Sequence, residues 1–262
     1  MEQQSFPLRF LDQDYKLFYI KEPGRAVQAL KQLMDKDVVV GFDLETYSYE
    51  QYRHDKTAPL DPLRSFPRLI QICDGKNVLV FDTLFGINLG LFRTFLESKR
   101  LLAHNAMFEI QHVIHNFKTD IADIGCTYLA TKLLHHALYV DDGGIAAGLE
   151  DVVKGLFKVN LFKEIDHKFW CVPDLTYEQI EYAALDAIAV LKVGERLVKG
   201  LTKYGLLKVY KLYKDAQWPL AKMQLNGMKI DVEKHRELIG KWKPRSLTVI
   251  CERMCLAALA LS

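Results

Sequence analysis

Apolar positions along the chain follow two patterns, and these divide it into predicted strands and helices. Short apolar runs predict strands at residues 14–24, 38–46, 69–74, 77–82 and 100–104. Apolar positions three and four apart predict helices at residues 24–37, 90–98, 106–117, 127–138, 149–157 and 176–201. Strands come early, helices dominate later, and the apolar strand at 38–46 is expected at the centre. The pattern predicts an α/β fold, a sheet covered by helices.

The central predicted strand ends in two carboxylates, Asp43 and Glu45. Its apolar start, from Val38 to Val40, is typical of a strand buried in a parallel sheet. Side chains two residues apart on a strand point to the same side, so the two like charges should face together. Such a pair repels and calls for a cation. A strand end with two solvated acids explains the same residues, and they do not decide between the two interpretations.

Two further acidic residues are notable for their spacing. Glu109 follows Asn105 by four residues at a strand-to-helix junction, and Asp186 follows Tyr182 by four residues inside the long predicted helix. A separation of four puts each pair on one helical face. Asp186 stands among alanines, which would let the helix lie close to a sheet, and an apolar setting makes a carboxylate costly unless it binds a ligand. Tyr182 alone is more simply a core aromatic.

Local signals also mark the ends of the predicted units. Thr176, with Gln179 three residues later, is a capping-box pattern that predicts the start of the long helix. A second unit is expected to begin near residue 214. The last residues, from 241 onward, have weak periodicity and are expected to be poorly ordered.

Composition is that of a globular protein, with 50% hydrophobic and 26% charged residues among 262. No stretch approaches the roughly 20 apolar residues of a membrane helix, and no secretory signal is recognisable. Five cysteines without a CxxC pair favour reduced thiols and argue against zinc. These features predict a protein without a membrane partner, located in the cytoplasm or an equivalent reducing compartment, an organelle not being excluded.

Charge is unevenly distributed. Residues 201–262 hold 12 Lys and Arg against 5 Asp and Glu, a formal charge of +7, so the remainder carries −5 to give +2 overall. An acidic body is unlike a protein that coats duplex nucleic acid. It is compatible with carboxylates gathered around metal ions, although a solvated basic helix explains the tail equally well.

The spaced residues together resemble the three motifs of the DEDD (DnaQ-like) 3′–5′ exonucleases. The motifs are Asp43-x-Glu45, Asn105-x-x-x-Glu109 and Tyr182-x-x-x-Asp186. The tyrosine resembles that of the DEDDy branch, which includes ribonuclease D and the proofreading domain of family A DNA polymerases. Residues 219–235 are similar to the segment that joins proofreading and polymerase domains, and the resemblance covers about residues 15–235.

The resemblance implies a ribonuclease H-like mixed sheet flanked by helices, with a short helical C-terminal extension. It implies an exonuclease domain at 1–205 and, at 206–262, an extension similar to the start of a family A polymerase domain. A polymerase domain or subunit is therefore a predicted partner. Nothing in the chain resembles the polymerase motifs themselves.

The resemblance also assigns roles to the acids. Four carboxylates without Cys or His ligands favour two divalent cations, Mg²⁺ or Mn²⁺. Asp43 would bridge both cations, Glu45 and Asp186 would complete the first site, and Glu109 would act on the second through water. Tyr182 would orient the attacking water. Glu109 departs from the family, which usually has Asp there, and this difference affects the expected rate more than the fold.

The predicted substrate is the 3′ end of single-stranded DNA, from which nucleoside 5′-monophosphates would be released. Thr46, Asn105 and Phe108 are expected to contact the terminal nucleotide. The loop after the first motif combines aromatic and basic residues suited to stacking and phosphate contacts, namely Tyr47, Tyr49, Tyr52, Arg53, Lys56, Arg64 and Arg68. His104 is expected to be structural.

Two alternatives remain open. Trimming of RNA 3′ ends, as by ribonuclease D, would use the same catalytic residues. A non-catalytic scaffold that binds nucleic acid is the other, although such modules are expected to have lost acids.

Overall fold

A computed structural model describes residues 5–121, 123–138, 146–161 and 170–242. In these residues a seven-stranded mixed sheet has the order β1-β2-β5-β4-β3-β6-β7. The strands are β1 (Phe6–Phe10), β2 (Gln13–Ile20), β3 (Val39–Ser48), β4 (Ser65–Cys73), β5 (Asn77–Asp82), β6 (Arg100–Ala103) and β7 (Asp123–Cys126). The ribonuclease H-like α/β fold predicted from the sequence is confirmed.

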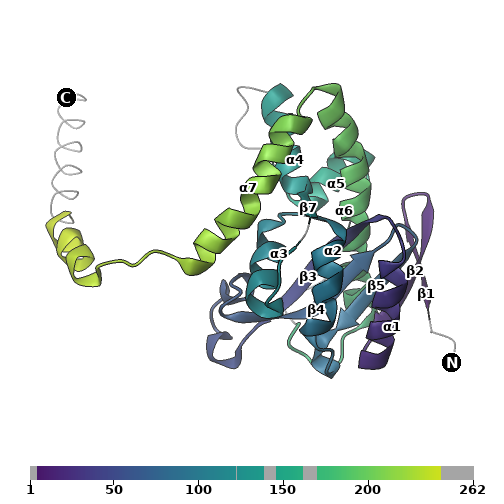
Figure 1. Cartoon of the computed structure of the whole chain (residues 1–262), viewed down its shortest axis with the longest axis horizontal. Coiled ribbons are helices and arrows are strands. Elements are labelled where there is room, and N and C mark those ends of the chain that lie inside the picture. Colours follow the sequence, from purple (N-terminus) through teal and green to yellow (C-terminus); the bar gives the residue numbers. More distant parts are fainter. Residues whose placement is uncertain (1–4, 122, 139–145, 162–169, 243–262) are drawn as a thin grey trace, which may run out of the picture. The chain divides into compact units, whose positions relative to one another are not determined.

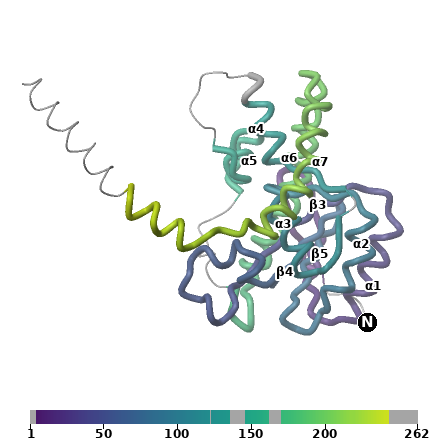
Figure 2. The backbone as a smooth tube through the Cα atoms, turned by 60° about the vertical axis from the view of Figure 1, so that its left-hand side comes forward, coloured from purple at the N-terminus to yellow at the C-terminus, as the bar shows by residue number. Residues whose placement is uncertain are grey.

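Helices cover both faces of the sheet (Figures 1 and 2). They are α1 (Pro23–Met34), α2 (Arg93–Ser98), α3 (Met107–His112), α4 (Thr127–Leu138), α5 (Leu149–Phe157), α6 (Tyr177–Lys203) and α7 (Leu207–Asn226). Buried residues of α1, α2 and α3 pack on one face, in one core cluster. Buried residues of α4, α5 and α6 pack on the other, in a second cluster. Each strand of the middle of the sheet is therefore buried on both sides.

The predicted central strand is β3, but its pairing differs from the prediction. β3 pairs antiparallel with β4 and parallel with β6, so it does not lie in a purely parallel sheet. Val39, at its first position, is 41% exposed because the apolar run begins before the sheet is covered. Burial then alternates along β3 from Leu44 onward.

Two edge strands were missing from the prediction. β1 is short and contains Pro7, which is tolerated because β1 is an edge strand. It pairs antiparallel with β2, across a turn in which Leu11 has a φ of 55°. β7 has only four residues, at the opposite edge of the sheet. Neither strand is long enough to show a clear period in the sequence.

Helix α6 begins where the sequence predicted. The Thr176 side chain accepts a hydrogen bond from the Gln179 backbone, and the Gln179 side chain accepts one from the Thr176 backbone. These reciprocal bonds satisfy backbone donors that a helix start leaves unpaired. Ala183, Ala184 and Ala187 on α6 are completely buried against the sheet, as expected from the run of small residues.

The chain divides into two compact units, Met1–Leu225 and Asn226–Ser262. Within the first unit, α7 packs near β7: the Tyr210 hydroxyl accepts the backbone N–H of Cys126 at 2.8 Å, and Lys214 pairs with Asp123 at 2.6 Å. The assignment of an exonuclease domain to 1–205 and of a polymerase-like extension to 206–262 stays a prediction. The predicted poor order of the C-terminal end concerns mainly residues 243–262, outside the described residues.

Among the described residues, no helix is both long and apolar enough to cross a membrane. Cys73 and Cys126 are buried with free thiols, and Cys171 is exposed with a free thiol.

Candidate active site

Three of the predicted acids lie together. Asp43 and Glu45 alternate with Phe42 and Leu44 on β3, so both carboxylates project from the face that α6 covers. Helix α6 brings Asp186 over the same place. Oxygen atoms of the three carboxylates all lie within 4.8 Å of one another, which could hold a metal ion. The carboxylates come from a strand and from a helix more than 140 residues later, and the family resemblance implied that they would meet.

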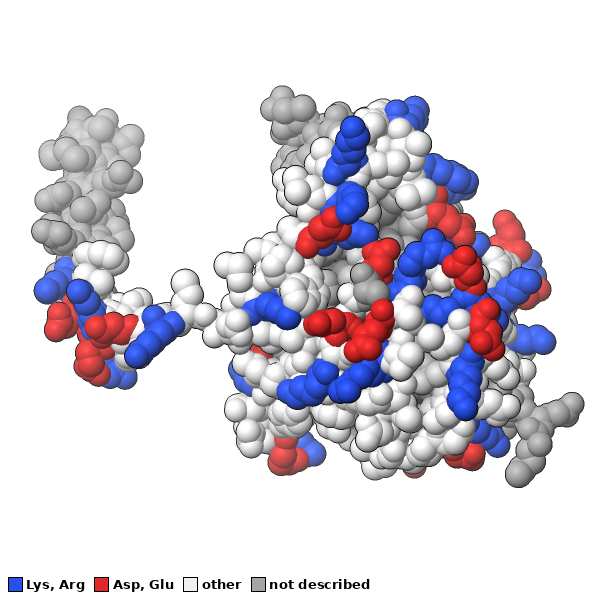
Figure 3. All heavy atoms as spheres, in the orientation of Figure 1, with Lys and Arg blue, Asp and Glu red and all other residues white. Residues whose placement is uncertain are grey.

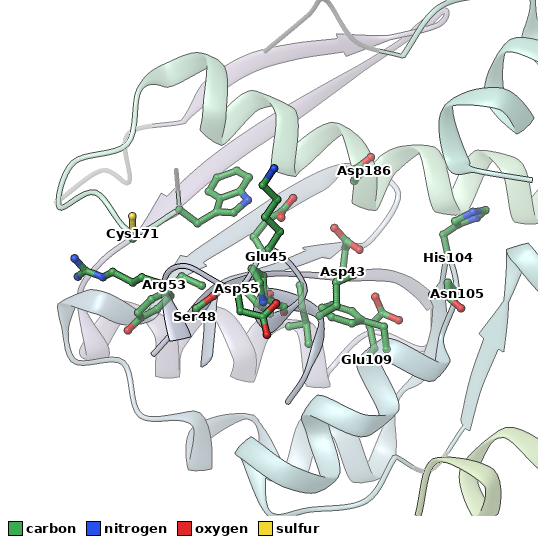
Figure 4. Close-up of a pocket in the computed structure, with 18 residues that line it drawn as sticks. Asp43, Glu45, Ser48, Arg53, Asp55, His104, Asn105, Glu109, Cys171 and Asp186 are labelled. Carbon is green, nitrogen blue, oxygen red and sulfur yellow. Dashed lines mark hydrogen bonds between the residues drawn. The ribbon is translucent and has the colours of Figure 1, made fainter. Parts of the chain in front are cut away.

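Glu109 faces the same cleft from α3. Its side chain is 1% exposed, and within the described part of the chain its Oε2 atom has no hydrogen-bond partner. Burial and the charge of Asp43 raise the pKa of Glu109 well above its usual value. Glu109 is not in the group within 4.8 Å, so it lies beside the three other acids as a fourth, more distant carboxylate. Figure 4 shows Asp43, Glu109 and Asp186 around one space.

Burial raises the pKa of every acid in the site, and repulsion from neighbouring carboxylates adds to this effect for Glu45, Glu109 and Asp186. Burial raises the pKa of Asp43 to about 7. Burial, then the charges of Asp43 and Asp186, raise the pKa of Glu45 well above its usual value. Burial and the charge of Asp43 do the same for the pKa of Asp186. A bound cation would relieve this repulsion, so the donor set, which consists of carboxylate oxygens, fits a hard divalent cation.

Tyr182 and Trp170 contact the acids from the α6 side. The Tyr182 hydroxyl donates a hydrogen bond to Asp186, and burial together with the nearby carboxylates raises the pKa of the phenol. The Trp170 side chain lowers the pKa of Glu45, against the larger effect of burial, and its ring lies 6.4 Å from that of Tyr182. Tyr182 was expected here. Trp170 was not, because a single tryptophan before a helix has no periodicity or spacing that would distinguish it.

These side chains line a cleft of about 790 Å³. The residues expected to contact a terminal nucleotide, Thr46, Asn105 and Phe108, all line it. Thr46 is 7% exposed and its hydroxyl donates to the Pro59 carbonyl at 2.5 Å. Asn105 is exposed and has a φ of 63°, in the left-handed region that asparagine tolerates. Phe108 is half-buried, with its ring 4.5 Å from that of His112.

Only some of the aromatic and basic residues predicted to contact substrate from the loop after β3 line the cleft. Tyr47, Arg53 and Lys56 line the cleft. Arg64 instead pairs with Asp55 and with Asp61, inside the loop. Tyr49 and Tyr52 are half-buried and do not line the cleft.

Arg68 was wrongly predicted to contact substrate. Its side chain lies on β4 with 0% exposure, paired with the equally buried Asp82. Arg68 directly precedes the apolar run of the predicted strand at 69–74, which is compatible with burial. The acid that neutralises it comes 14 residues later on β5, and nothing in the local sequence identifies that partner.

His104 lines the cleft, and its expected structural role stays a prediction. Its Nδ1 atom lies 2.9 Å from the Thr127 hydroxyl, and burial lowers its pKa to about 4, so the ring is neutral at neutral pH. In Figure 4, His104 and Asn105 lie at one end of the cleft, whereas Arg53 and Cys171 lie at the other.

Charges on the face shown in Figure 3 are mixed. On the face shown in Figure 3, Lys and Arg are interspersed with Asp and Glu, without one continuous basic stripe. This distribution is unlike the surface of a protein that coats duplex nucleic acid.

The fold and the clustered acids agree with comparisons to known proteins. None of the curated proteins matches the chain in sequence. Among solved structures, Brucella melitensis NrnC with bound Mg²⁺ is 22% identical, with a TM-score of 0.58, over 75% of this chain and 90% of that one. Escherichia coli RNase D is 16% identical, with a TM-score of 0.64, over 80% of this chain and 51% of that one. The catalytic core of RRP6 from Trypanosoma brucei is 19% identical, with a TM-score of 0.60, over 82% of this chain and 55% of that one.

A family model described as 3′–5′ exonuclease matches residues 18–202. This range contains all three motifs and the whole cleft described above. The predicted resemblance is confirmed, and the chain belongs to the 3′–5′ exonuclease family.

Proposed function

We propose that the protein is a metal-dependent exonuclease that removes nucleotides from the 3′ ends of single-stranded nucleic acid, and that the clustered acids are its catalytic centre. The proposal depends above all on the approach of Asp43, Glu45 and Asp186, whose carboxylate oxygens lie within 4.8 Å of one another. Three charges so close together are unfavourable unless they are protonated or share a cation.

Each acid has a proposed role as a ligand. Asp43, between the other carboxylates, would bridge two divalent cations, Mg²⁺ or Mn²⁺. Glu45 and Asp186 would complete the first site. Glu109, which is buried but more distant, would act on the second through water. Bound cations of this kind activate a water and stabilise charge on the attacking and leaving oxygens.

Tyr182 is proposed to orient the attacking water. Its phenol has a raised pKa, because it is buried among carboxylates, so it stays protonated at neutral pH. A protonated phenol is a hydrogen-bond donor and a poor general base. The hydrogen bond to Asp186 fixes the ring beside the proposed first metal site.

Thr46, Asn105 and Phe108 are proposed to receive the terminal nucleotide, and the position of all three along the cleft supports this. The Thr46 hydroxyl already donates to Pro59, so its contact with substrate would use the backbone or the methyl group. Arg53 and Lys56 would contact the phosphates of the following nucleotides. Because the acids line the cleft, the last phosphodiester must enter it, so a frayed or single-stranded end is required.

Single-stranded DNA, with release of nucleoside 5′-monophosphates, is the first candidate substrate, because the chain resembles the proofreading branch of the family. RNA is the second candidate. It is favoured by the structural likeness to RNase D, an exoribonuclease involved in structured RNA processing, and to NrnC, one structure of which is bound to pGG. A polymerase partner and a role in DNA replication or repair stay predictions.

Digestion of 5′-labelled single strands tests the proposal. DNA and RNA of one sequence are incubated with Mg²⁺ or with a chelator, and the expected product is a ladder that shortens from the 3′ end only with metal. Asp186→Asn should abolish the ladder. Asp174→Asn, an exposed residue just before α6, is the matched control and should not. No shortening of either strand, or wild-type rates for Asp186→Asn, would contradict the proposed function and favour a scaffold.

A further inference from the structure

The segment between Trp170 and Pro173, just before α6, forms part of the cleft wall. Trp170 and Cys171 line the cleft. The Trp170 ring is 8% exposed, and the cleft that it lines also contains Glu45, whose pKa the Trp170 side chain lowers. This segment has no regular secondary structure, so its own backbone does not fix the position of the indole. Something else must hold it.

Arg68 holds this segment through hydrogen bonds to its backbone. Its Nη1 atom donates to the carbonyl oxygens of Trp170 at 2.9 Å and of Val172 at 2.7 Å, and its Nη2 atom donates to that of Pro173 at 3.0 Å. Its remaining two donors pair with the Asp82 carboxylate, at 2.6 and 2.9 Å. All five N–H donors of a guanidinium are therefore used.

Asp82 is itself held from several sides. It is completely buried, and it accepts a hydrogen bond from the Tyr19 hydroxyl and one from the Leu84 backbone in addition to those from Arg68. Both partners of the ion pair thus have fixed positions at the middle of the sheet. The guanidinium fork transmits this fixed geometry to three carbonyl oxygens more than 100 residues away in the chain.

We propose that Arg68 is a positioning residue for the metal site. By fixing the backbone at 170–173, it holds the Trp170 indole in the cleft wall that Glu45 also lines, where the N–H can donate to the Glu45 carboxylate and orient it toward Asp43 and Asp186. The inference rests on the proposed function, because it concerns a ligand of that site. A buried ion pair needed only for stability would be satisfied by Asp82, whereas the three carbonyl contacts connect Arg68 to the cleft wall.

Lysine can replace the charge of Arg68 but not its geometry. An ammonium group is a point donor and lacks the planar fork. Arg68→Lys should therefore keep a cation beside Asp82 and release the segment at 170–173. Trp170→Phe should keep an aromatic wall and remove only the N–H donor to Glu45. Outer hydrogen bonds to a metal ligand typically change metal affinity by about 10–100-fold.

Two measurements without nucleic acid test the proposal. The first is acrylamide quenching of Trp170 fluorescence, in a background with Trp218→Phe and Trp242→Phe that leaves one tryptophan of three. The second is Mn²⁺ binding by calorimetry. Arg68→Lys should raise the quenching constant at least about twofold and weaken Mn²⁺ binding about 10-fold, and Trp170→Phe should weaken Mn²⁺ binding about 10-fold with a nearly unchanged melting temperature.

Leu17→Ala is the control for general destabilisation, because Leu17 is completely buried in the same core cluster as Trp170. It should lower the melting temperature and change neither quenching nor Mn²⁺ affinity. If Arg68→Lys does not fold, Asp82→Asn, which removes the charge that orients the guanidinium, takes its place with the same expectations. Wild-type Mn²⁺ affinity in Trp170→Phe, or wild-type quenching in the folded Arg68 or Asp82 variant, overturns the positioning role. A wild-type protein that binds no Mn²⁺ overturns the proposed function instead.

Discussion

A β-carbon at Gly41 would overlap the backbone carbonyl oxygen of Ala187. Gly41 is two residues before Asp43 on β3, and Ala187 directly follows Asp186 on α6. The missing side chain at Gly41 therefore lets the helix approach the strand at the point where both acids lie. Any larger residue there would push the helix carrying Asp186 away from the strand carrying Asp43.

Gly41→Ala should consequently destabilise the protein and weaken its metal site. Overpacking of this kind costs about 1–3 kcal/mol, and displacement of α6 should reduce Mn²⁺ affinity at the same time. Gly155→Ala in α5 is the matched control, because a β-carbon added there would have no atom within 4 Å, and it should be neutral or stabilising. Urea unfolding and Mn²⁺ calorimetry measure both effects. An unchanged affinity in Gly41→Ala would mean that the close approach does not set the site.

Metal-free stability should fall as pH rises. Burial raises the folded-state pKa of Asp43 from 3.8 to about 7, so the folded protein binds a proton more tightly than the unfolded chain. The stability from this proton is complete below about pH 3.8 and is lost as pH rises through about 7. Glu45, Asp186 and Glu109, with raised pKa values, act in the same sense.

Thermal melts with a chelator between pH 5 and 8 check this, with Asp43→Asn expected to flatten the decline. Buried His104 and His112 act in the opposite direction. Burial lowers the pKa of each ring to about 4 in the folded protein, so their contribution to the free energy of unfolding rises between pH 4 and 6.5. The difference between Asp43→Asn and wild type therefore isolates the acids. Asp37→Asn, with a fully exposed side chain, is the control and should keep the wild-type profile. Identical profiles for Asp43→Asn and wild type would refute the prediction.

The negative charge of Glu109 should affect activity more than the length of its side chain does. Glu109→Asp is expected to keep activity, whereas Glu109→Gln should lose most of it, because the cleft needs a fourth negative charge to hold the second cation. The longer side chain makes the site less preorganised, so Mn²⁺, which is less demanding in geometry, should raise the rate above that with Mg²⁺. Metal titrations of all three proteins on one single strand measure this, with the exposed Glu195→Gln as control. Wild-type rates for Glu109→Gln would exclude Glu109 from the metal site.

Modification of the Cys171 thiol should inhibit the protein by obstructing the cleft, because the thiol itself takes no part in the proposed reaction. Cys171 is exposed and lines the cleft, whereas Cys73 and Cys126 are buried, with pKa values that burial raises. A bulky maleimide should inhibit wild type, and methylthiolation should have a smaller effect. Cys171→Ser should remain active and become resistant to the maleimide, as rate measurements before and after treatment would show. Loss of activity in Cys171→Ser itself would indicate that the thiol has a chemical role.

Local sequence patterns determined much of the site. The Asp43 and Glu45 pair, the spacing of Tyr182 and Asp186, and the capping box at Thr176 depend on strand and helix periods and on hydrogen bonds within a few residues. These quantities are readable from consecutive positions, and the structure confirms the capping box. The meeting of Asp43, Glu45 and Asp186 was implied by the family resemblance and not by a local period, and their carboxylate oxygens lie within 4.8 Å of one another.

Tertiary structure alone decided the role of Arg68 and the position of Trp170. Arg68 directly precedes the apolar run of the predicted strand at 69–74, but nothing in its neighbours identifies the partners that allow a charge to be buried there. Its burial depends on an acid 14 residues later and on carbonyl oxygens more than 100 residues later, which reach it only when β4, β5 and the segment before α6 come together. The partners of a buried charge are set by contacts between residues distant in sequence. The periodicity of strands and helices contains no information about such contacts.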